Sequence, residues 1–139
     1  MNIDSIENGI VLDHIAANKS MEIYRYLKLD ALDCGVAVIR NVKSAKRGFK
    51  DIIKIDAAID IDLDVLGYID PGVTVNIIRD GKLVEKTQVA LPARLAGVIQ
   101  CGNPRCITSV EPGLEQVFLL RDREYREYRC AYCEEKSNR

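Results

Sequence analysis

Apolar runs separated by turn residues characterise the chain from its start to about residue 96. Strands are predicted where β-branched and other apolar residues predominate over short stretches bounded by polar residues, glycine or proline. These stretches are residues 9–15, 34–42, 51–55, 73–79 and 83–89. The last two are separated by Asp80-Gly81-Lys82, and Asp-Gly is a strong hairpin signal because both residues tolerate positive φ. The pattern therefore predicts a β-hairpin at this point.

Two helices are predicted between these strands. The first begins after Asn18, whose side chain is a good N-cap, and carries apolar residues at helical spacing. Its apolar residues are Met21, Ile23, Tyr24, Leu27 and Leu29. The second is a short acidic helix near residues 62–68, and a basic loop at residues 43–48 joins the second and third strands. The order βαββαββ favours an α+β fold, a ferredoxin-like α/β sandwich in which an antiparallel sheet carries both helices on one face.

The last part of the chain has a different pattern, because the four cysteines other than Cys34 all follow Gln100. The preceding segment, residues 91–97, carries a proline and a glycine, as short connections between domains often do. The two predicted domains are residues 1–96 and 97–139. The strands predicted in the second domain are residues 107–110, 116–120 and 124–129. Short strands around paired cysteines indicate a small zinc-ribbon-like β domain.

The spacing of these cysteines predicts a metal site. Cys101 and Cys106 are separated by four residues, Cys130 and Cys133 by two, and 23 residues lie between the pairs. Two pairs on tight turns can place four thiolates at the tetrahedral corners that zinc occupies in structural sites. Four cysteines leave no open position for a substrate, so the site would be structural, and its metal would stabilise a domain of about forty residues. The alternatives are four unrelated buried thiols or a redox pair at Cys130 and Cys133.

Composition narrows the functions that the chain can have. Of its 139 residues, 47% are hydrophobic and 29% charged, which is typical of a globular protein with a real core. With 20 Lys+Arg against 21 Asp+Glu, any contact with phosphate must be local. No leader and no apolar stretch near the roughly 18 residues needed to span a bilayer is seen, so a cytoplasmic location without membrane contact is expected. In that reducing environment cysteines favour metal over disulfides, and Cys34, within an apolar strand, is expected to be a core residue.

Several motifs occur together in one order along nearly the whole chain. They are GIVLDHI at residues 9–15, KDIIKI at 50–55, Pro71 with Thr74-Val75-Asn76, Leu91-Pro92 and the four-cysteine spacing. In this combination the chain resembles the regulatory chain of aspartate carbamoyltransferase. The resemblance implies an amino-terminal allosteric domain that binds CTP, UTP or ATP, and a zinc domain that docks onto the catalytic chain. It also implies regulatory homodimers that join catalytic trimers in pyrimidine biosynthesis, and a chain that catalyses nothing itself.

The resemblance further implies which residues form the nucleotide site. Matched motif by motif, they are Asp13, His14, Lys50, Lys54, Asn76, Ile78, Leu83 and Lys86, with residues 3–6 lining the base. Lys50 and Lys54 lie four apart on one face of a strand, and a triphosphate needs several cations. Without the resemblance, His14 would be interpreted as a packed strand residue, Asp13 as an edge acid and the lysines as solvated. The family's bulky aromatic residue near the hairpin tip is replaced here by Gly81.

Two other classes of function fit the chain less well. A zinc ribbon can bind nucleic acid, but residues 98–139 contain seven basic and seven acidic residues, so a phosphate backbone would meet equal repulsion. Mixed charge together with Tyr125, Tyr128 and Tyr132 suits a protein interface better. A small enzyme would need a nucleophile with its base or an open metal position, and one histidine beside a closed four-cysteine set provides neither. We therefore expect no catalytic residues and no nucleic-acid partner.

Overall fold

The chain forms two compact units, Met1–Ala90 and Leu91–Arg139. The structure is a computed structural model that describes residues 6–45 and 48–137. The sequence pattern places the division later, after residue 96. The difference arises because β6 (Arg94–Ala96), within the segment expected to be a connection, pairs with a strand of the second unit.

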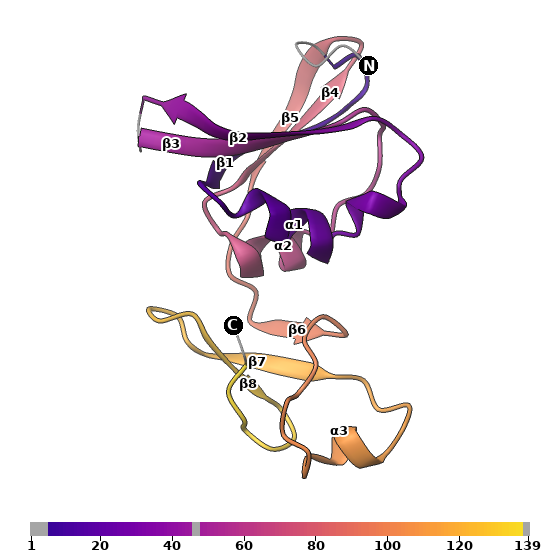
Figure 1. The fold of residues 1–139 in the computed structure, drawn as a ribbon, viewed down its shortest axis with the longest axis vertical. Helices are drawn as coiled ribbons and strands as arrows, with labels where there is room; N and C mark the ends of the chain where they lie inside the picture. The colour runs from indigo at the N-terminus through magenta and orange to yellow at the C-terminus, as the bar shows by residue number, and fades with distance from the viewer. Residues whose placement is uncertain (1–5, 46–47, 138–139) are drawn as a thin grey trace. The chain divides into compact units, whose positions relative to one another are not determined.

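The first unit contains a five-stranded antiparallel sheet and two α-helices (Figure 1). Its elements are β1 (Gly9–Ala16), α1 (Ser20–Tyr26), a 3₁₀ turn η1 (Leu29–Ala31), β2 (Val36–Ser44), β3 (Gly48–Ile55), α2 (Leu63–Ile69), β4 (Thr74–Arg79) and β5 (Lys82–Gln88). The strand order is β2-β3-β1-β4-β5, and both helices lie on the same face of the sheet. The predicted βαββαββ order and the ferredoxin-like arrangement are confirmed, with β5 as an additional edge strand.

The core lies between the sheet and the two helices. Leu12 of β1 pairs with Ile53 on one side and with Val75 on the other, so one row of apolar side chains crosses three strands. Ile23 of α1 and Leu66 of α2 are both completely buried, as is Leu12. Burying each side chain of this size contributes roughly 1.5 to 3 kcal/mol. We call the helix-covered side the inner face of the sheet and the opposite side its outer face.

The start of α1 differs from the prediction. Asn18 is not the N-cap: its φ is 73°, and Lys19 occupies the cap position without a side-chain hydrogen bond. The carboxylate of Asp51, from β3, instead accepts hydrogen bonds from the Ser20 N–H at 3.3 Å and the Ser20 hydroxyl at 2.6 Å. A distant residue thus satisfies the donors at the helix start, and α1 ends at Tyr26, before Leu27 and Leu29.

The hairpin between β4 and β5 confirms the sequence signal. Asp80 and Gly81 form the two-residue turn with φ of 52° and 75°, the positive values that this turn requires. The basic loop predicted at residues 43–48 is shorter than expected, because β2 extends to Ser44 and β3 begins at Gly48. Lys46 and Arg47 lie outside the described residues.

The second unit contains a three-stranded sheet in the order β6-β7-β8. Its further elements are α3 (Ile107–Val110), β7 (Val117–Asp122) and β8 (Glu127–Cys130). Residues 107–110 were predicted as a strand, and this prediction is wrong. The local turn explains the helix, because the Ser109 N–H bonds to the Cys106 carbonyl and the Glu111 N–H to the Ile107 carbonyl. Among the described residues, no helix is long and apolar enough to cross a membrane.

Candidate functional site

Four cysteine sulfurs of the second unit lie close together. The Sγ atoms of Cys101 and Cys133 are 3.6 Å apart, those of Cys106 and Cys130 are 3.7 Å apart, and all four lie within 4.8 Å of one another. A metal bound tetrahedrally at about 2.3 Å from each thiolate, as zinc is, separates the sulfurs by about 3.8 Å. The residues therefore fit such a metal closely, and the predicted four-cysteine cluster is present.

Each pair of cysteines is held by a turn. In the first, the Cys106 N–H bonds to the Asn103 carbonyl at 3.0 Å, and the Asn103 N–H points to the Cys101 sulfur at 3.5 Å. The Thr108 hydroxyl donates to the Cys106 sulfur at 3.0 Å. The second pair follows directly from β8, which ends at Cys130. Such donors orient metal ligands and offset part of their negative charge.

The titration of these thiols explains why a cation belongs among them. Burial raises the pKa of Cys101 to about 12, whereas the hydrogen bond from Thr108 lowers the pKa of Cys106 to about 7. Four neighbouring thiols cannot all be ionised at neutral pH without a positive charge between them. A divalent metal provides that charge, and four cysteines leave no coordination position for a substrate. The arrangement is therefore that of a structural metal centre.

A second group of side chains, which the sequence predicts to bind nucleotide, lies on the outer face of the first unit's sheet. The register places Lys54, Val11, Asn76 and Lys86 opposite one another on β3, β1, β4 and β5. The strands are about 4.8 Å apart, so the two lysines stand roughly 14 Å apart at the ends of this row. The Asn76 side chain donates to the Val11 carbonyl at 3.3 Å, which fixes the amide between them.

The hairpin end of this face is apolar. Ile78 pairs with Gly9 on one side and with Leu83 on the other. Leu83 and Lys86 are three residues apart, yet both face outward, because the register shifts between Ile77 and Ile78. A bulge at this shift inserts one unpaired residue and reverses the alternation of faces.

The opposite end of the face contains a pocket of about 450 Å³. The pocket is lined by His14, Ile15, Ala16, Ala17, Ser44, Phe49, Lys50, Gly72, Thr74, Lys86 and Gln88. Three of the eight predicted nucleotide residues, His14, Lys50 and Lys86, are among them. The other five, Asp13, Lys54, Asn76, Ile78 and Leu83, belong to the same strands but not to the pocket lining. Of the stretch predicted to line the base, only Ile6 is described, and it is buried.

A bulge in β1 directs His14 toward this pocket. His14 has a φ of 59°, and the pairing of β1 with β3 shifts by one residue between Leu12 and Ile15. The Asp13 carboxylate accepts the His14 N–H at 2.6 Å and forms an ion pair with Lys50 at 2.9 Å. Burial alone would raise the pKa of Asp13, but these two hydrogen bonds outweigh it and lower the pKa. The buried Nδ1 atom of His14 has no hydrogen-bond partner among the described residues.

Two buried aspartates, which the sequence analysis did not identify, hold the pocket wall. Asp51 bonds to the N–H groups of Asn18 and Ser20, and Asp70 accepts the N–H of Ala16 at 2.7 Å. The sequence does contain a signal for the buried position of Asp51. Lys50 and Lys54 face outward, so the alternation of faces along β3 places Asp51 on the inward side. An acid at an inward position needs donors from its neighbours.

Comparison with known proteins identifies the family. Residues 1–90 match the family described as aspartate carbamoyltransferase regulatory chain, allosteric domain, and residues 93–139 match the metal binding domain of the same chain. The chain belongs to the aspartate carbamoyltransferase regulatory chains. Three curated relatives carry that name. The one from Bifidobacterium longum is 49% identical over 137 residues, which cover 99% of each chain. Those from Clostridium acetobutylicum and Clostridium tetani are 50% and 51% identical, over 97% of this chain and 92% and 94% of theirs.

Membership gives each unit a role. The first unit is the allosteric domain of a regulatory, non-catalytic chain, and the second is its metal-binding domain with the four-cysteine cluster. The resemblance noted in the sequence, and the expectation that the chain is not the catalytic one, are thereby confirmed. The sheet face and pocket described above lie in the allosteric domain, and the sulfur cluster lies in the metal-binding domain.

Proposed function

We propose that the allosteric domain binds nucleoside triphosphates such as CTP, UTP and ATP across the outer face of its sheet. The observation that carries this proposal is the single row from Lys54 through Asn76 to Lys86. It connects an apolar end, at Ile78 and Leu83, with the polar pocket. The base and ribose lie toward the apolar end, and the phosphates lie toward the pocket.

The polar pocket suits the phosphates for electrostatic reasons. Lys50 and Lys86 supply charge, and His14, which also lines the pocket, supplies a further polar side chain. Asp13 holds Lys50 at 2.9 Å, so a phosphate would share this lysine with the carboxylate. The lowered pKa of Asp13 keeps it ionised, and it opposes a bound anion unless Lys50 remains between them.

The metal of the second unit is, in this proposal, one structural zinc ion held by Cys101, Cys106, Cys130 and Cys133. The sulfur separations of 3.6 and 3.7 Å support zinc, whose thiolate sites have this size. None of the five cysteines forms a disulfide, and free cysteines suit a cytoplasmic chain. Zinc would supply folding energy to a unit whose core is small.

The same unit would dock onto the catalytic chain, while regulatory chains associate as homodimers. Exposed apolar side chains support a docking surface beside the first cysteine pair: Ile107 is 49% exposed, Val110 67% and Leu114 40%. The arginines of this unit do not favour binding of nucleic acid, because several of them form ion pairs with acidic side chains. Arg121 contacts Glu134 at 2.6 Å, and Arg129 contacts Glu127 at 3.0 Å.

The nucleotide site is tested by replacing the two lysines that line the pocket, Lys50 and Lys86. Lys50→Ala or Lys86→Ala should each remove about 1.5 to 3 kcal/mol of binding for CTP and for ATP, because both nucleotides carry the triphosphate. Affinity measured by calorimetry should therefore fall at least about tenfold. Lys82→Ala is the matched control, since Lys82 lies on the same strand but pairs with Arg79 on the inner face.

The contrary result would be equally clear. If both lysine variants bind both nucleotides as tightly as the wild type does, the site lies elsewhere. For the assembly, the variants should form the same complex with a catalytic trimer as the wild type, and lose only the response of activity to nucleotide. Removing the metal should have the reverse effect: assembly is lost and nucleotide binding remains.

A further inference from the structure

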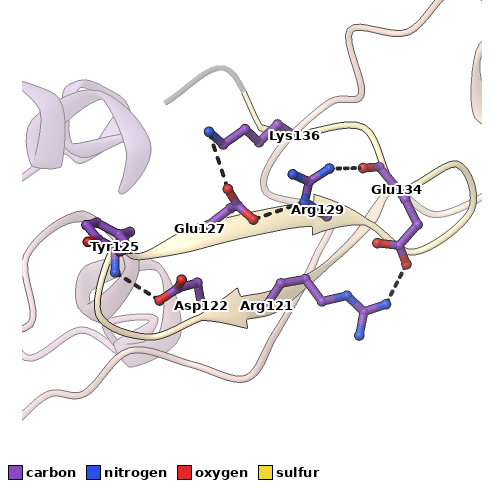
Figure 2. A network of polar contacts seen from close by, with 7 residues as sticks. All are labelled: Arg121, Asp122, Tyr125, Glu127, Arg129, Glu134 and Lys136. Atoms are coloured by element: carbon purple, nitrogen blue, oxygen red, sulfur yellow. Dashed lines mark hydrogen bonds and ion pairs between the residues drawn. The ribbon is translucent and has the colours of Figure 1, made fainter.

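The chain segment after the last cysteine is fastened by charged side chains (Figure 2). They come from β7, from β8 and from the segment itself, and we name them the knuckle network: Arg121, Glu127, Arg129, Glu134 and Lys136. Arg121 contacts the Glu134 carboxylate at 2.6 Å, and Glu127 lies between Arg129 at 3.0 Å and Lys136 at 3.3 Å. Acids and bases alternate, so each acid has at least one basic neighbour.

Glu134 is the centre of this network and directly follows a metal ligand. Its N–H bonds to the Cys130 carbonyl at 2.9 Å, and its own carbonyl accepts the Arg129 guanidinium at 2.9 Å. Its φ is 65°, which costs a residue with a β-carbon about 1 to 2 kcal/mol relative to ordinary backbone. The residue after Cys133 is therefore held in an unfavourable conformation by contacts to its backbone and its side chain.

Cys133 is the cysteine of the cluster with the most access to water. Cys101, Cys106 and Cys130 are buried, whereas Cys133 is half-buried. The segment that follows it is paired with β8, through the Cys130 N–H to the Glu135 carbonyl and the Ser137 N–H to the Tyr128 carbonyl, both at 2.9 Å. If a tetrahedral metal centre loses its ion one ligand at a time, a chelator in solution reaches the most exposed ligand first, and among these four cysteines that ligand is Cys133.

We infer that the knuckle network is a latch on Cys133 which sets the rate at which the metal-binding domain releases its ion. Arg121 and Arg129 act as positioning residues, because they hold Glu134 and through it the ligand, without touching the metal. The inference rests on the proposed zinc site. Because the latch consists of partly exposed ion pairs, salt weakens it. Metal retention is thus responsive to ionic strength.

The test uses the full chain loaded with zinc and two arginine variants. Arg121→Gln removes one ion pair, and an exposed pair alone changes an equilibrium by less than about fivefold, so release to an excess of chromogenic chelator should be roughly threefold faster. Adding Arg129→Gln also removes the hold on the Glu134 carbonyl, and release should become about tenfold faster, as for other groups that orient metal ligands. Arg121→Lys keeps the charge and should restore most of the wild-type rate.

Two readouts separate a latch from general weakening. Alkylation by iodoacetamide, mapped by mass spectrometry, should accelerate first at Cys133 and not at Cys101 or Cys106. Raising salt should speed release from the wild type and leave the double variant nearly unchanged. The control is Arg94→Gln, because Arg94 and Glu115 form a 3.9 Å ion pair, 59% and 62% exposed, outside the network.

The outcomes separate failure of the latch from failure of the zinc site. Release at the wild-type rate from the double variant, or equal alkylation of all four cysteines, overturns the latch while leaving the zinc site intact. Zinc release that is accelerated equally by Arg94→Gln also overturns the latch, because loss of any surface charge would then have the same effect. A wild-type chain that binds no metal overturns the latch and the zinc site together, which distinguishes the two failures.

Discussion

Replacing the buried carboxylate of Asp51 is the sharpest test of how the allosteric domain is held together. Asp51 is completely buried and accepts four hydrogen bonds. One oxygen receives the Ser20 hydroxyl at 2.6 Å and the N–H groups of Asn18 and Ser20 at 3.1 and 3.3 Å, and the other receives the Asn41 N–H at 2.9 Å. Both Asn18 and Asn41 have positive φ, at 73° and 59°, so the carboxylate stabilises two unfavourable backbone turns.

Asp51→Asn keeps the shape and removes half of the acceptors. An amide offers one oxygen, so either the Ser20 side or the Asn41 side faces an NH₂ group and keeps an unsatisfied buried donor. A lost hydrogen bond to a charged group is worth about 1.5 to 3 kcal/mol, and an unsatisfied donor costs about 1 to 3 kcal/mol. Since these are two descriptions of one loss, the free energy of unfolding should fall by about 2 to 3 kcal/mol.

The dependence on pH gives a second measurement. Burial alone would raise the pKa of Asp51, but the Ser20 hydroxyl and the backbone donors outweigh it and lower the pKa in the folded chain. A carboxyl with a lowered folded pKa stabilises the fold fully above its unfolded pKa of about 3.9, and this stabilisation is lost as pH falls through the folded pKa. The difference between wild type and Asp51→Asn should therefore be constant near neutral pH and shrink below about pH 4.

The assay is urea denaturation of the whole chain, followed by circular dichroism, between pH 3 and pH 7. Asp60→Asn is the control, because Asp60 is an exposed acid of the same domain. A loss below about 0.5 kcal/mol, the usual range for surface substitutions, would refute the reasoning for Asp51. So would a difference that persists unchanged at pH 3, because below about pH 3.9 the unfolded wild type takes up a proton that its folded carboxylate resists, and its extra stability must fall.

Two further predictions concern other parts of the chain. Cys130→Ser should abolish stoichiometric binding of about one zinc per chain, measured by atomic absorption, and unfold the second unit in circular dichroism while the first keeps its melting transition. A folded second unit without metal would contradict it. Gly67→Ala should destabilise the allosteric domain by about 2 kcal/mol or more, because the added methyl group would collide with the Ala90 carbonyl and a packed site accommodates it only by moving. An unchanged urea midpoint would show that this contact is loose.

The sequence predicts the order of elements in the allosteric domain because its strands follow simple alternation. It does not predict the face on which every residue lies, since bulges interrupt that alternation. His14 and the residue between Leu83 and Glu85 are each extra residues in their strands, and each reverses the faces that follow. A bulge depends on pairing with a neighbouring strand, so residues within one strand do not reveal it.

Both wrong predictions concern backbone groups whose partners residue propensities do not reveal, one partner being distant in sequence and the other lying in a local turn. Asn18 is a sound local choice as a cap, but Asp51 reaches the same donors from another strand. Residues 107–110 include β-branched side chains, yet the turn that ends at Cys106 starts a helix there. The four cysteines were found because their spacing is itself a local signal of a long-range contact.

The distribution of charge over the two faces of the sheet explains why binding and folding can be altered separately. Lys54 and Lys86 lie on the outer face, where their replacement leaves the packing of Leu12 and Ile53 unchanged. Asp51 lies on the inner face, and its loss should lower stability and loosen the pocket wall together. An effector that binds the outer face can change activity only through a difference in affinity between two states of the assembly. The pocket wall at Ala16 and Ala17 joins ligand-lining residues to the buried Asp51 contacts, so changes in this segment should alter coupling as well as affinity.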